Sequence, residues 1–312
     1  SEPQGEYDLR CALADYVRER RNVVTAPEHI VVGAGVQMLL EILCVLLKGR
    51  RTVSFPDGSF VQGSTVFAAH GYTVLPRYKD ADIIYVSPSH MNRQGDVMPI
   101  QRRLELCAHS ADTGAVVIED DFENDFLYSS TPTPSLYALG SGNVVYMGAF
   151  SALLLPGIRI SFMVLSPALA AAYHQMKDTF AQTASKTEQI ALCAYLRDGN
   201  MKSRTKKIRR LYTGKAKTLC ALLAKALPDH PVRVGENGLQ VQIETPMLPD
   251  SAPFEQAGLA LYIVKEKSGK NIVVVSPSAV PADRLEEAAL AVAAALYKAE
   301  EAAKAKQSKD IY

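Results

Sequence analysis

The sequence predicts an α/β fold: a large domain with a mostly parallel sheet sandwiched by helices, followed by a smaller C-terminal α+β domain. Over the first two thirds of the chain, short apolar and β-branched runs alternate with longer helical patterns. These runs are almost continuously apolar, which is typical of parallel strands covered on both faces. The chain has 312 residues and is 48% hydrophobic, which is enough for two subdomains.

The order of the elements follows from the spacing of the apolar residues. Helices are predicted at 8–20, 36–48, 59–70 and 99–111, and apolar spacings of three and four indicate that 36–48 is largely buried. Strands are predicted between and after them, at 29–33, 51–55, 72–76, 82–87, 114–120, 143–148 and 158–165. After residue 166 we predict long helices at 167–197 and 201–227, strands at 238–243, 259–264 and 271–275, and a helix at 282–304. We expect the large domain to span 1–190 and the small domain 191–312.

Composition excludes several classes of protein. Lys and Arg number 34 against 33 Asp and Glu, and this balance argues against a dedicated nucleic-acid surface. No apolar run is long enough to suggest a membrane span. Five dispersed cysteines indicate free thiols in a reducing compartment, so we expect a cytoplasmic protein without a metal site. The basic run 202–217 could bind nucleic acid, but we interpret it as a solvated helix face with Ile208, Leu211 and Leu219 turned inward.

The segment GAGVQ (33–37) lies between a predicted strand and a predicted helix. Small residues at a helix start expose backbone N–H groups and the positive end of the helix dipole, which suits a phosphate. The alternative is a turn that needs glycine only for its geometry.

Two further motifs carry charges in apolar surroundings. Glu119, Asp120 and Asp121 end a predicted buried strand, where open α/β sheets bind ligands. Such a carboxylate could pair with a protonated ring nitrogen, or it could belong to a polar loop entrance. Arg159 is a single cation in the predicted strand 158–165 and needs an anionic partner, either a phosphate or one of these acids.

These motifs, in this order, resemble the aminotransferase-like domain of MocR/GabR-type transcription regulators of the GntR family. That domain has the aspartate aminotransferase-like fold type I of pyridoxal-phosphate proteins. The resemblance covers about 300 residues, on EPQGEYDLRCALADYVRERR (2–21), GAGVQ, YVSPSHMNRQGDVMP (85–99), VVIEDDFENDF and GAFSALLLPGIRI. It implies pyridoxal 5'-phosphate as the cofactor, held non-covalently or as an external aldimine with an amino acid.

The resemblance also implies the residues around the cofactor. Gly35, Val36 and Gln37 would form the phosphate cup, with Ser151 and Arg159 as further phosphate contacts. Phe60 would stack on the pyridine ring, and His90 would pass beside it. Asp120 would hold the pyridinium nitrogen in a charge-assisted pair.

The sequence departs from the family pattern at four places. The lysine that forms the Schiff base is replaced by Ala152, so no catalytic residue is assigned. A tyrosine is replaced by Phe122 and a hydroxyl donor by Ala149, and 259–280 lacks the arginine that clamps a substrate carboxylate. Lys265, Lys267 and Lys270 look like solvated loop charges. Ala152 is either a deliberate substitution, which the otherwise intact motif favours, or the natural residue of a non-covalent sensor.

The resemblance implies an effector-sensing domain rather than an enzyme. It would bind pyridoxal phosphate and a small amino acid, for example D-alanine or γ-aminobutyrate, and act as a homodimer. DNA would be bound through a winged-helix domain that we expect to lie outside this chain. The alternatives are an aminotransferase inactivated at position 152 and, less favoured, a scaffold that no longer binds the cofactor.

Overall fold

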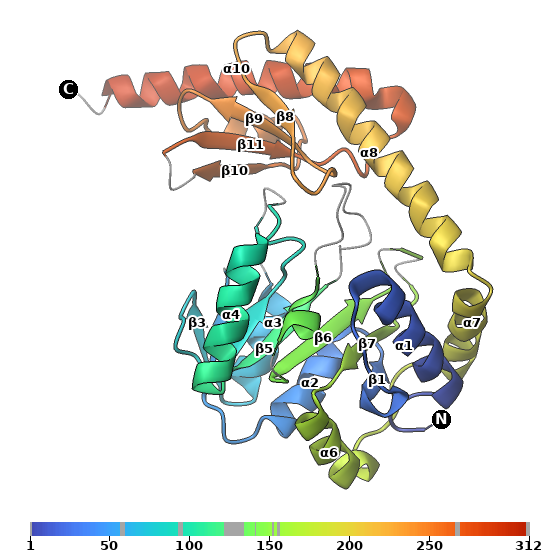
Figure 1. Ribbon diagram of the computed structural model, residues 1–312. Coiled ribbons are helices and arrows are strands. Elements are labelled where there is room, and N and C mark those ends of the chain that lie inside the picture. Colours follow the sequence, from blue (N-terminus) through green and yellow to red (C-terminus); the bar gives the residue numbers. More distant parts are fainter. Residues whose placement is uncertain are drawn as a thin grey trace. The chain divides into compact units, whose positions relative to one another are not determined.

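The computed structural model describes residues 2–56, 60–92, 96–121, 134–140, 142–151, 153–154, 157–265 and 269–309. The chain divides into two compact units, which Figure 1 shows as two groups of helices and strands. Apart from Asn92 and Asp96, which group with the second unit, the boundary falls between Thr205 and Lys206. The assignment of 1–190 and 191–312 to a large and a small domain stays a prediction.

The first unit is a seven-stranded sheet with helices on both faces. Its helices are α1 (Tyr7–Arg21), α2 (Val36–Leu46), α3 (Val61–Ala69), α4 (Ile100–Thr113), α5 (Leu136–Leu139), α6 (Pro167–Met176) and α7 (Lys186–Arg197). Its strands are β1 (Ile30–Gly33), β2 (Thr52–Phe55), β3 (Thr73–Pro76), β4 (Ile83–Val86), β5 (Val116–Asp120), β6 (Val144–Ala149) and β7 (Ser161–Val164). The strand order is β1-β7-β6-β5-β4-β2-β3.

The sheet is mostly parallel, as predicted. Within it, β7 runs antiparallel to both of its neighbours, β1 and β6. The pairings of β2 with β3, β2 with β4, β4 with β5 and β5 with β6 are all parallel. The carboxyl ends of these parallel strands therefore share one edge of the sheet. The start of β7 lies at that same edge because this strand runs the other way.

The two faces of the sheet pack against different helices. On one face, Ile118 of β5 joins a core with Leu39 of α2, Phe67 of α3 and Tyr173 of α6. On the other face, Val117 packs with residues of α4 and α5. Successive side chains of a strand point to opposite faces. Asp120 therefore lies on the α2 side of β5, whereas Glu119 and Asp121 lie on the α4 side.

The second unit is an antiparallel sheet covered by helices. Its elements are the larger part of α8 (Asn200–Ala226), β8 (Val232–Val234), β9 (Val241–Thr245), α9 (Ala252–Gln256), β10 (Tyr262–Lys265), β11 (Asn271–Val275) and α10 (Leu285–Lys309). The strand order is β10-β11-β9-β8. Leu223 of α8 and Leu296 of α10 pack with Ile243 and Val273 of the sheet, so both helices contribute to one core (Figure 1).

Three local predictions were wrong. The single helix predicted at 167–197 breaks after Met176 and restarts at Lys186, because the intervening segment packs against the N-terminal part of the chain. Strand β8 was not predicted, since three residues are too few for a periodic signal. Leu219 of α8 is buried as predicted, but Leu211 is 52% exposed. No helix in the described part of the chain is long and apolar enough to cross a membrane.

Candidate functional site

The turn between β1 and α2 brings Gly35 and Arg159 together. Gly35 precedes the first residue of α2 and has a φ of +96°, a conformation that favours glycine. A Cβ atom added to Gly35 would lie 2.7 Å from Nη2 of Arg159, so the glycine leaves room for the guanidinium. No side chain caps the start of α2. A cation beside an uncapped helix start is an arrangement that suits an anion such as a phosphate.

Arg159 is exposed, and the prediction that it lies within an apolar strand was wrong. The reason is that β7 begins only at Ser161, where pairing with Gly33 and Ala149 starts. Arg159 precedes this ladder, and its side chain extends over the start of α2. It makes no ion pair with any residue that the structure describes, so the acids of β5 are not its partners.

The turn itself is held by backbone groups and by a distant threonine. The N–H of Ala34 donates to Oγ1 of Thr183 at 2.9 Å, and the N–H of Gly35 donates to the carbonyl of Gly33 at 3.0 Å. Val36 and Gln37 then form the first turn of α2, half-buried and exposed respectively. Thr183 was not among the predicted site residues, because only the fold brings it to this turn.

Asp120, at the end of β5, is buried and accepts a short hydrogen bond from the hydroxyl of Tyr85. Burial, followed by the charge of Asp120 and this hydrogen bond, raises the pKa of Tyr85 well above its usual range. The tyrosine therefore stays protonated and donates to the carboxylate. Asp120 is thus a fixed acceptor at the edge where the parallel strands end.

Tyr85 also connects Asp120 to the predicted stacking residue. The rings of Tyr85 and Phe60 are stacked with centroids 5.3 Å apart, and Phe55 stacks on Tyr85 at 4.9 Å. The predicted acid and the predicted aromatic residue therefore contact the same side chain. Tyr85 was missed, although a tyrosine in the apolar run DIIYVS needs a partner for its hydroxyl and could have been noticed.

Two further predicted residues lie in loops at the same edge. His90 follows β4, is half-buried, and donates its backbone N–H to the carbonyl of Ser87 at 3.0 Å. Ser151 follows β6 and is also half-buried. Phe122 and Ala152 lie outside the described residues, so their predicted places in the site stay predictions.

Behind Asp120, on the opposite face of β5, Asp121 is the centre of a buried polar network. Its carboxylate accepts from Nε of Arg21 at 2.6 Å, from the hydroxyl of Ser89 at 2.7 Å and from the hydroxyl of Tyr146 at 2.8 Å. These partners come from the end of α1, the loop after β4 and strand β6. One carboxylate therefore joins three elements beside the site, and one of them is the loop that carries His90.

Arg103 of α4 is hydrogen-bonded to the same loop. It is fully buried and donates to the carbonyls of Met98 at 3.0 Å, Pro134 at 2.9 Å and Pro88 at 3.4 Å. Burial, and then the charge of Arg21, lowers the pKa of Arg103. Backbone carbonyls thus take the place of a carboxylate partner, and they fix both ends of the loop.

Glu119 is the other acid of this face and is completely buried. Its Oε2 accepts from the N–H of Tyr137 at 3.0 Å, and Arg21 lies 3.6 Å from its Oε1. Burial, and then the charge of Asp121, raises the pKa of Glu119 to about 7, because Arg21 offsets these effects only in part. We attribute the weak effect of Arg21 to its closer bond with Asp121. No group of three His, Cys, Asp or Glu that could bind a metal occurs among the described residues.

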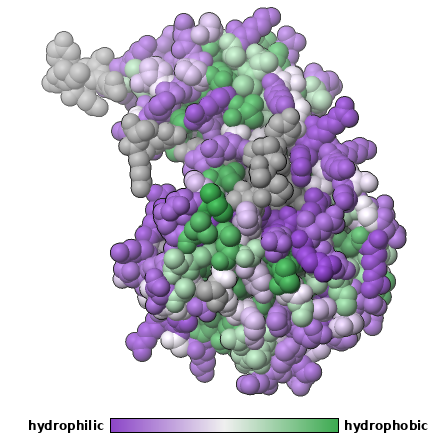
Figure 2. Space-filling model, in the orientation of Figure 1, coloured by the Kyte–Doolittle hydropathy of each residue, from purple (hydrophilic) through white to green (hydrophobic). Residues whose placement is uncertain are grey.

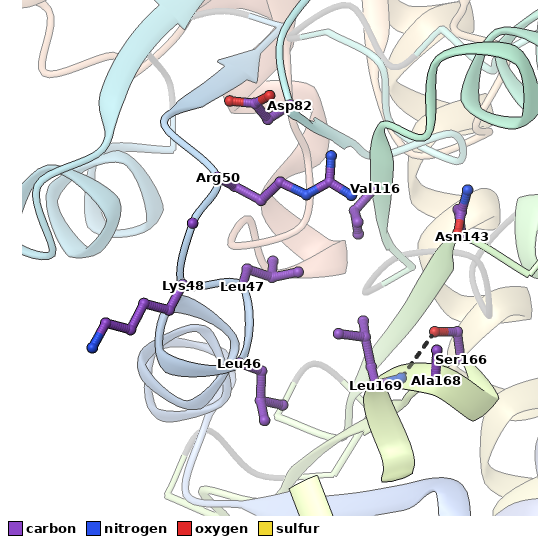
Figure 3. A pocket seen from close by; sticks show the side chains of 11 residues that line it. Leu46, Leu47, Lys48, Arg50, Asp82, Val116, Asn143, Ser166, Ala168 and Leu169 are labelled. Carbon is purple, nitrogen blue, oxygen red and sulfur yellow. Dashed lines mark hydrogen bonds between the residues drawn. The ribbon is translucent and has the colours of Figure 1, made fainter. Parts of the chain in front are cut away.

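A separate cavity of about 520 Å³ lies where β5 and β6 begin, at the other edge of the sheet (Figure 3). Its lining includes Arg50, Asp82, Val116 and Asn143. Arg50 donates to the carbonyl of Gly114 at 2.8 Å, and Asp82 accepts from backbone N–H groups of the β2 segment. None of the predicted site residues lines this cavity, so it is distinct from the site around Asp120.

Comparison with known proteins identifies the family. A family model for aminotransferase class I and II matches residues 1–281. The chain belongs to the aminotransferase class I and II family. Pyridoxal phosphate is the cofactor that this membership indicates.

The similar curated proteins include several regulators. The chain is 30% identical over 288 residues to the HTH-type transcriptional regulator YdeL of Bacillus subtilis, covering 88% of this chain and 60% of that protein. It is 35% identical over 255 residues to YhdI of the same organism, covering 77% and 54%. It is 29% identical to the probable rhizopine catabolism regulatory protein MocR of Rhizobium meliloti, covering 77% and 51%. The chain thus spans little more than half the length of these relatives.

Solved structures confirm the fold. An archaeal alanine:glyoxylate aminotransferase superposes with a TM-score of 0.79 at 20% identity, covering 96% of this chain and 82% of that one. The α-aminoadipate aminotransferase LysN of Thermus thermophilus gives a TM-score of 0.76 at 23% identity, covering 96% and 84%. The predicted aspartate aminotransferase-like fold type I is therefore confirmed.

The described residues fit pyridoxal phosphate at two separate points. The Arg159 guanidinium approaches the uncapped start of α2 because Gly35 has no Cβ, and a cation at a helix start suits the phosphate. The buried carboxylate of Asp120, held by Tyr85, suits a protonated ring nitrogen. Both points lie at the edge where open α/β sheets bind their ligands.

We predict that Gly35→Ala weakens the binding of pyridoxal phosphate at least about tenfold, which corresponds to about 1.4 kcal/mol. The added methyl group would occupy the space next to the Arg159 guanidinium. Fluorescence titration of the chain with pyridoxal phosphate measures the effect. Gly49→Ala is the matched control, because Gly49 has a φ of +108° and open space around it. Equal losses in the two variants would mean that backbone strain, not the phosphate site, causes the effect.

We also predict that Glu119 makes stability depend on pH. Its pKa of about 7 lies above its ordinary value of 4.5, so between these values the folded protein holds a proton that the unfolded chain releases. This stabilisation is complete below pH 4.5 and is lost as the pH rises through 7. In the unaltered chain, the free energy of unfolding should fall by up to about 3 kcal/mol as the pH rises over this range. In Glu119→Gln this fall should be absent.

Denaturant unfolding at several pH values between 5 and 8 measures this fall. The exposed Glu105 supplies the control, because Glu105→Gln removes a carboxylate from the surface of α4 and leaves the buried acids intact. If the profiles of Glu119→Gln and the unaltered chain run parallel, Glu119 does not titrate in this range.

Proposed function

We propose that this chain is the effector-binding domain of a transcription regulator, and that it holds pyridoxal phosphate without a covalent link to the protein. The regulators YdeL, YhdI and MocR support the first part, since the matches to them cover between 77% and 88% of this chain. The observation that carries the second part is the pairing of an anion site at Gly35 and Arg159 with the buried carboxylate of Asp120.

The residues of the site favour binding over turnover. Pyridoxal phosphate, when bound, supplies an electron-withdrawing ring to which amines can attach. Asp120 would keep the ring nitrogen protonated, Phe60 would stack on the ring, and Arg159 would hold the phosphate. Position 152 carries an alanine, which has neither an amine nor a base to move a proton. The chain therefore keeps the groups that bind and orient, and lacks the group that relatives of this fold use for chemistry.

The effector that we propose is a small amino acid, such as D-alanine or γ-aminobutyrate. The segment 259–280 contains no arginine to clamp a second carboxylate. Lys265 is exposed at the end of β10, and Lys270 is engaged with Glu244 at 2.9 Å. An effector that binds one conformation of a homodimer more tightly would change how a DNA-binding domain outside this chain is placed.

We predict that one small amino acid changes the visible absorbance of pyridoxal phosphate bound to the unaltered chain, and that others leave it unchanged. Selectivity is expected because the protein, and not the free cofactor, must position the amino acid. The measurement is an absorbance titration with a panel that includes D-alanine, L-alanine, γ-aminobutyrate and β-alanine, with free pyridoxal phosphate in buffer as the reference.

Ala152→Lys is the companion variant. We expect it to develop its own absorbance band with pyridoxal phosphate and to turn over the selected amino acid slowly or not at all. Rapid transamination by this variant would favour an aminotransferase and contradict the sensor. If neither protein retains pyridoxal phosphate through gel filtration, the chain is a scaffold that no longer binds the cofactor.

A further inference from the structure

Helix α8 carries many cations and no acid of its own, and its Lys202 pairs with Glu19 of α1 at 2.8 Å. Its 27 residues contain no Asp or Glu, and its cations are Lys202, Arg204, Lys206, Lys207, Arg209, Arg210, Lys215, Lys217 and Lys225. The chain as a whole is nearly neutral, with 34 basic and 33 acidic residues. The other long helix of the second unit, α10, mixes both signs in 25 residues. The charge of α8 is therefore a local feature, which the net charge of the chain conceals.

This arrangement is unfavourable for the helix itself. Lys206 lies four residues from both Lys202 and Arg210, and three from Arg209. Like charges at these spacings repel each other and destabilise a helix. A solvated helix face normally alternates its charges so that such pairs attract. The absence of acids over the whole of α8 therefore points to an anion outside the helix.

Part of this helix surface is hollowed. Lys206, Arg209, Arg210 and Lys217 line a depression of about 330 Å³, together with Thr213 and Gly214. All six residues belong to the second unit. The space beside Gly214 is open, because an added Cβ would meet no neighbouring atom within 4 Å. The hollow therefore offers cations around a space that is free of large side chains.

The cations of the hollow form a row along the helix. Lys206, Arg210 and Lys217 are spaced by four and seven residues, so they lie on one face and extend over about 16 Å. Leu219 and Leu223 pack into the core from another face. In Figure 2, strongly hydrophilic side chains follow the right-hand border, where Figure 1 shows α8. Neither Lys206 nor Arg210 makes an ion pair within the described ranges.

We infer that this basic face of α8 (Lys206, Arg209, Arg210 and Lys217) binds the phosphate backbone of DNA. A row of cations of this length matches an extended polyanion better than a single small anion. The contact is independent of base sequence, because lysine and arginine bind backbone phosphates through charge. The inference rests on the proposed role as a regulator, and it gives the effector-binding domain its own contact with DNA.

The test is fluorescence anisotropy of the 312-residue chain with a labelled duplex of about 20 base pairs and arbitrary sequence, at about 50 to 200 mM salt. The unaltered chain should bind, and the affinity should fall steeply with salt. The double variant Lys206→Ala/Arg210→Ala should bind at least about tenfold more weakly. Its slope of log affinity against log salt should be smaller by about 2, since each phosphate contact contributes about 0.9.

The control is Lys225→Ala/Lys298→Ala, which removes the same charge from exposed positions of the same unit outside the hollow. Equal losses in the two double variants would overturn the inference, as would the absence of any DNA binding. Competition by poly-glutamate or by millimolar inorganic phosphate that exceeds competition by unlabelled DNA would also overturn it. An effector-dependent absorbance change in a chain that does not bind DNA would leave the proposed sensor intact and reject only this contact.

Discussion

The site depends on the ion pair between Arg21 and Asp121. The two groups are 2.6 Å apart and almost completely buried, and Asp121 also accepts from Ser89 and Tyr146. Burying charges is costly, and removing one partner of such a pair typically costs about 3 to 5 kcal/mol because the other charge is left uncompensated. The pair therefore fixes the end of α1, the loop after β4 and strand β6 relative to the end of β5. Loops that carry binding residues are positioned in this way by a rigid scaffold.

Successive acids at the end of β5 point to opposite faces of the sheet, and the two faces offer different partners. Glu119 and Asp121 point to one face of the sheet, where they meet Arg21, and Asp120 points to the other, where it meets Tyr85. Family membership indicates pyridoxal phosphate as the cofactor, and a single acid on the ligand side is what a protonated ring nitrogen requires. Three consecutive acids in the sequence therefore face two sides of the sheet and have different partners.

Strand periodicity predicted the α/β fold with its mostly parallel sheet, whereas the resemblance to MocR-type regulators supplied most residues of the candidate site. Gly35, Phe60, His90, Asp120, Ser151 and Arg159 all come to the edge where the parallel strands end. The partners of these residues were less predictable. Tyr85 and Thr183 reach the site through strand pairing and a distant loop, and no local pattern reports such contacts. The strand predicted to start at 158 starts at Ser161, three residues later, because pairing on both sides decides where β7 begins.

We propose that Asp120 and the anion site hold pyridoxal phosphate although position 152 is an alanine. The most direct measurement is the dissociation constant of pyridoxal phosphate for the unaltered chain and for Asp120→Asn, by equilibrium dialysis. The asparagine keeps an oxygen for the Tyr85 hydroxyl and removes the charge. We expect reversible binding by the unaltered chain and at least about tenfold weaker binding by the variant, since a charge-assisted pair is lost. Equal affinities, or no binding by the unaltered chain, would contradict this role of Asp120 and the anion site.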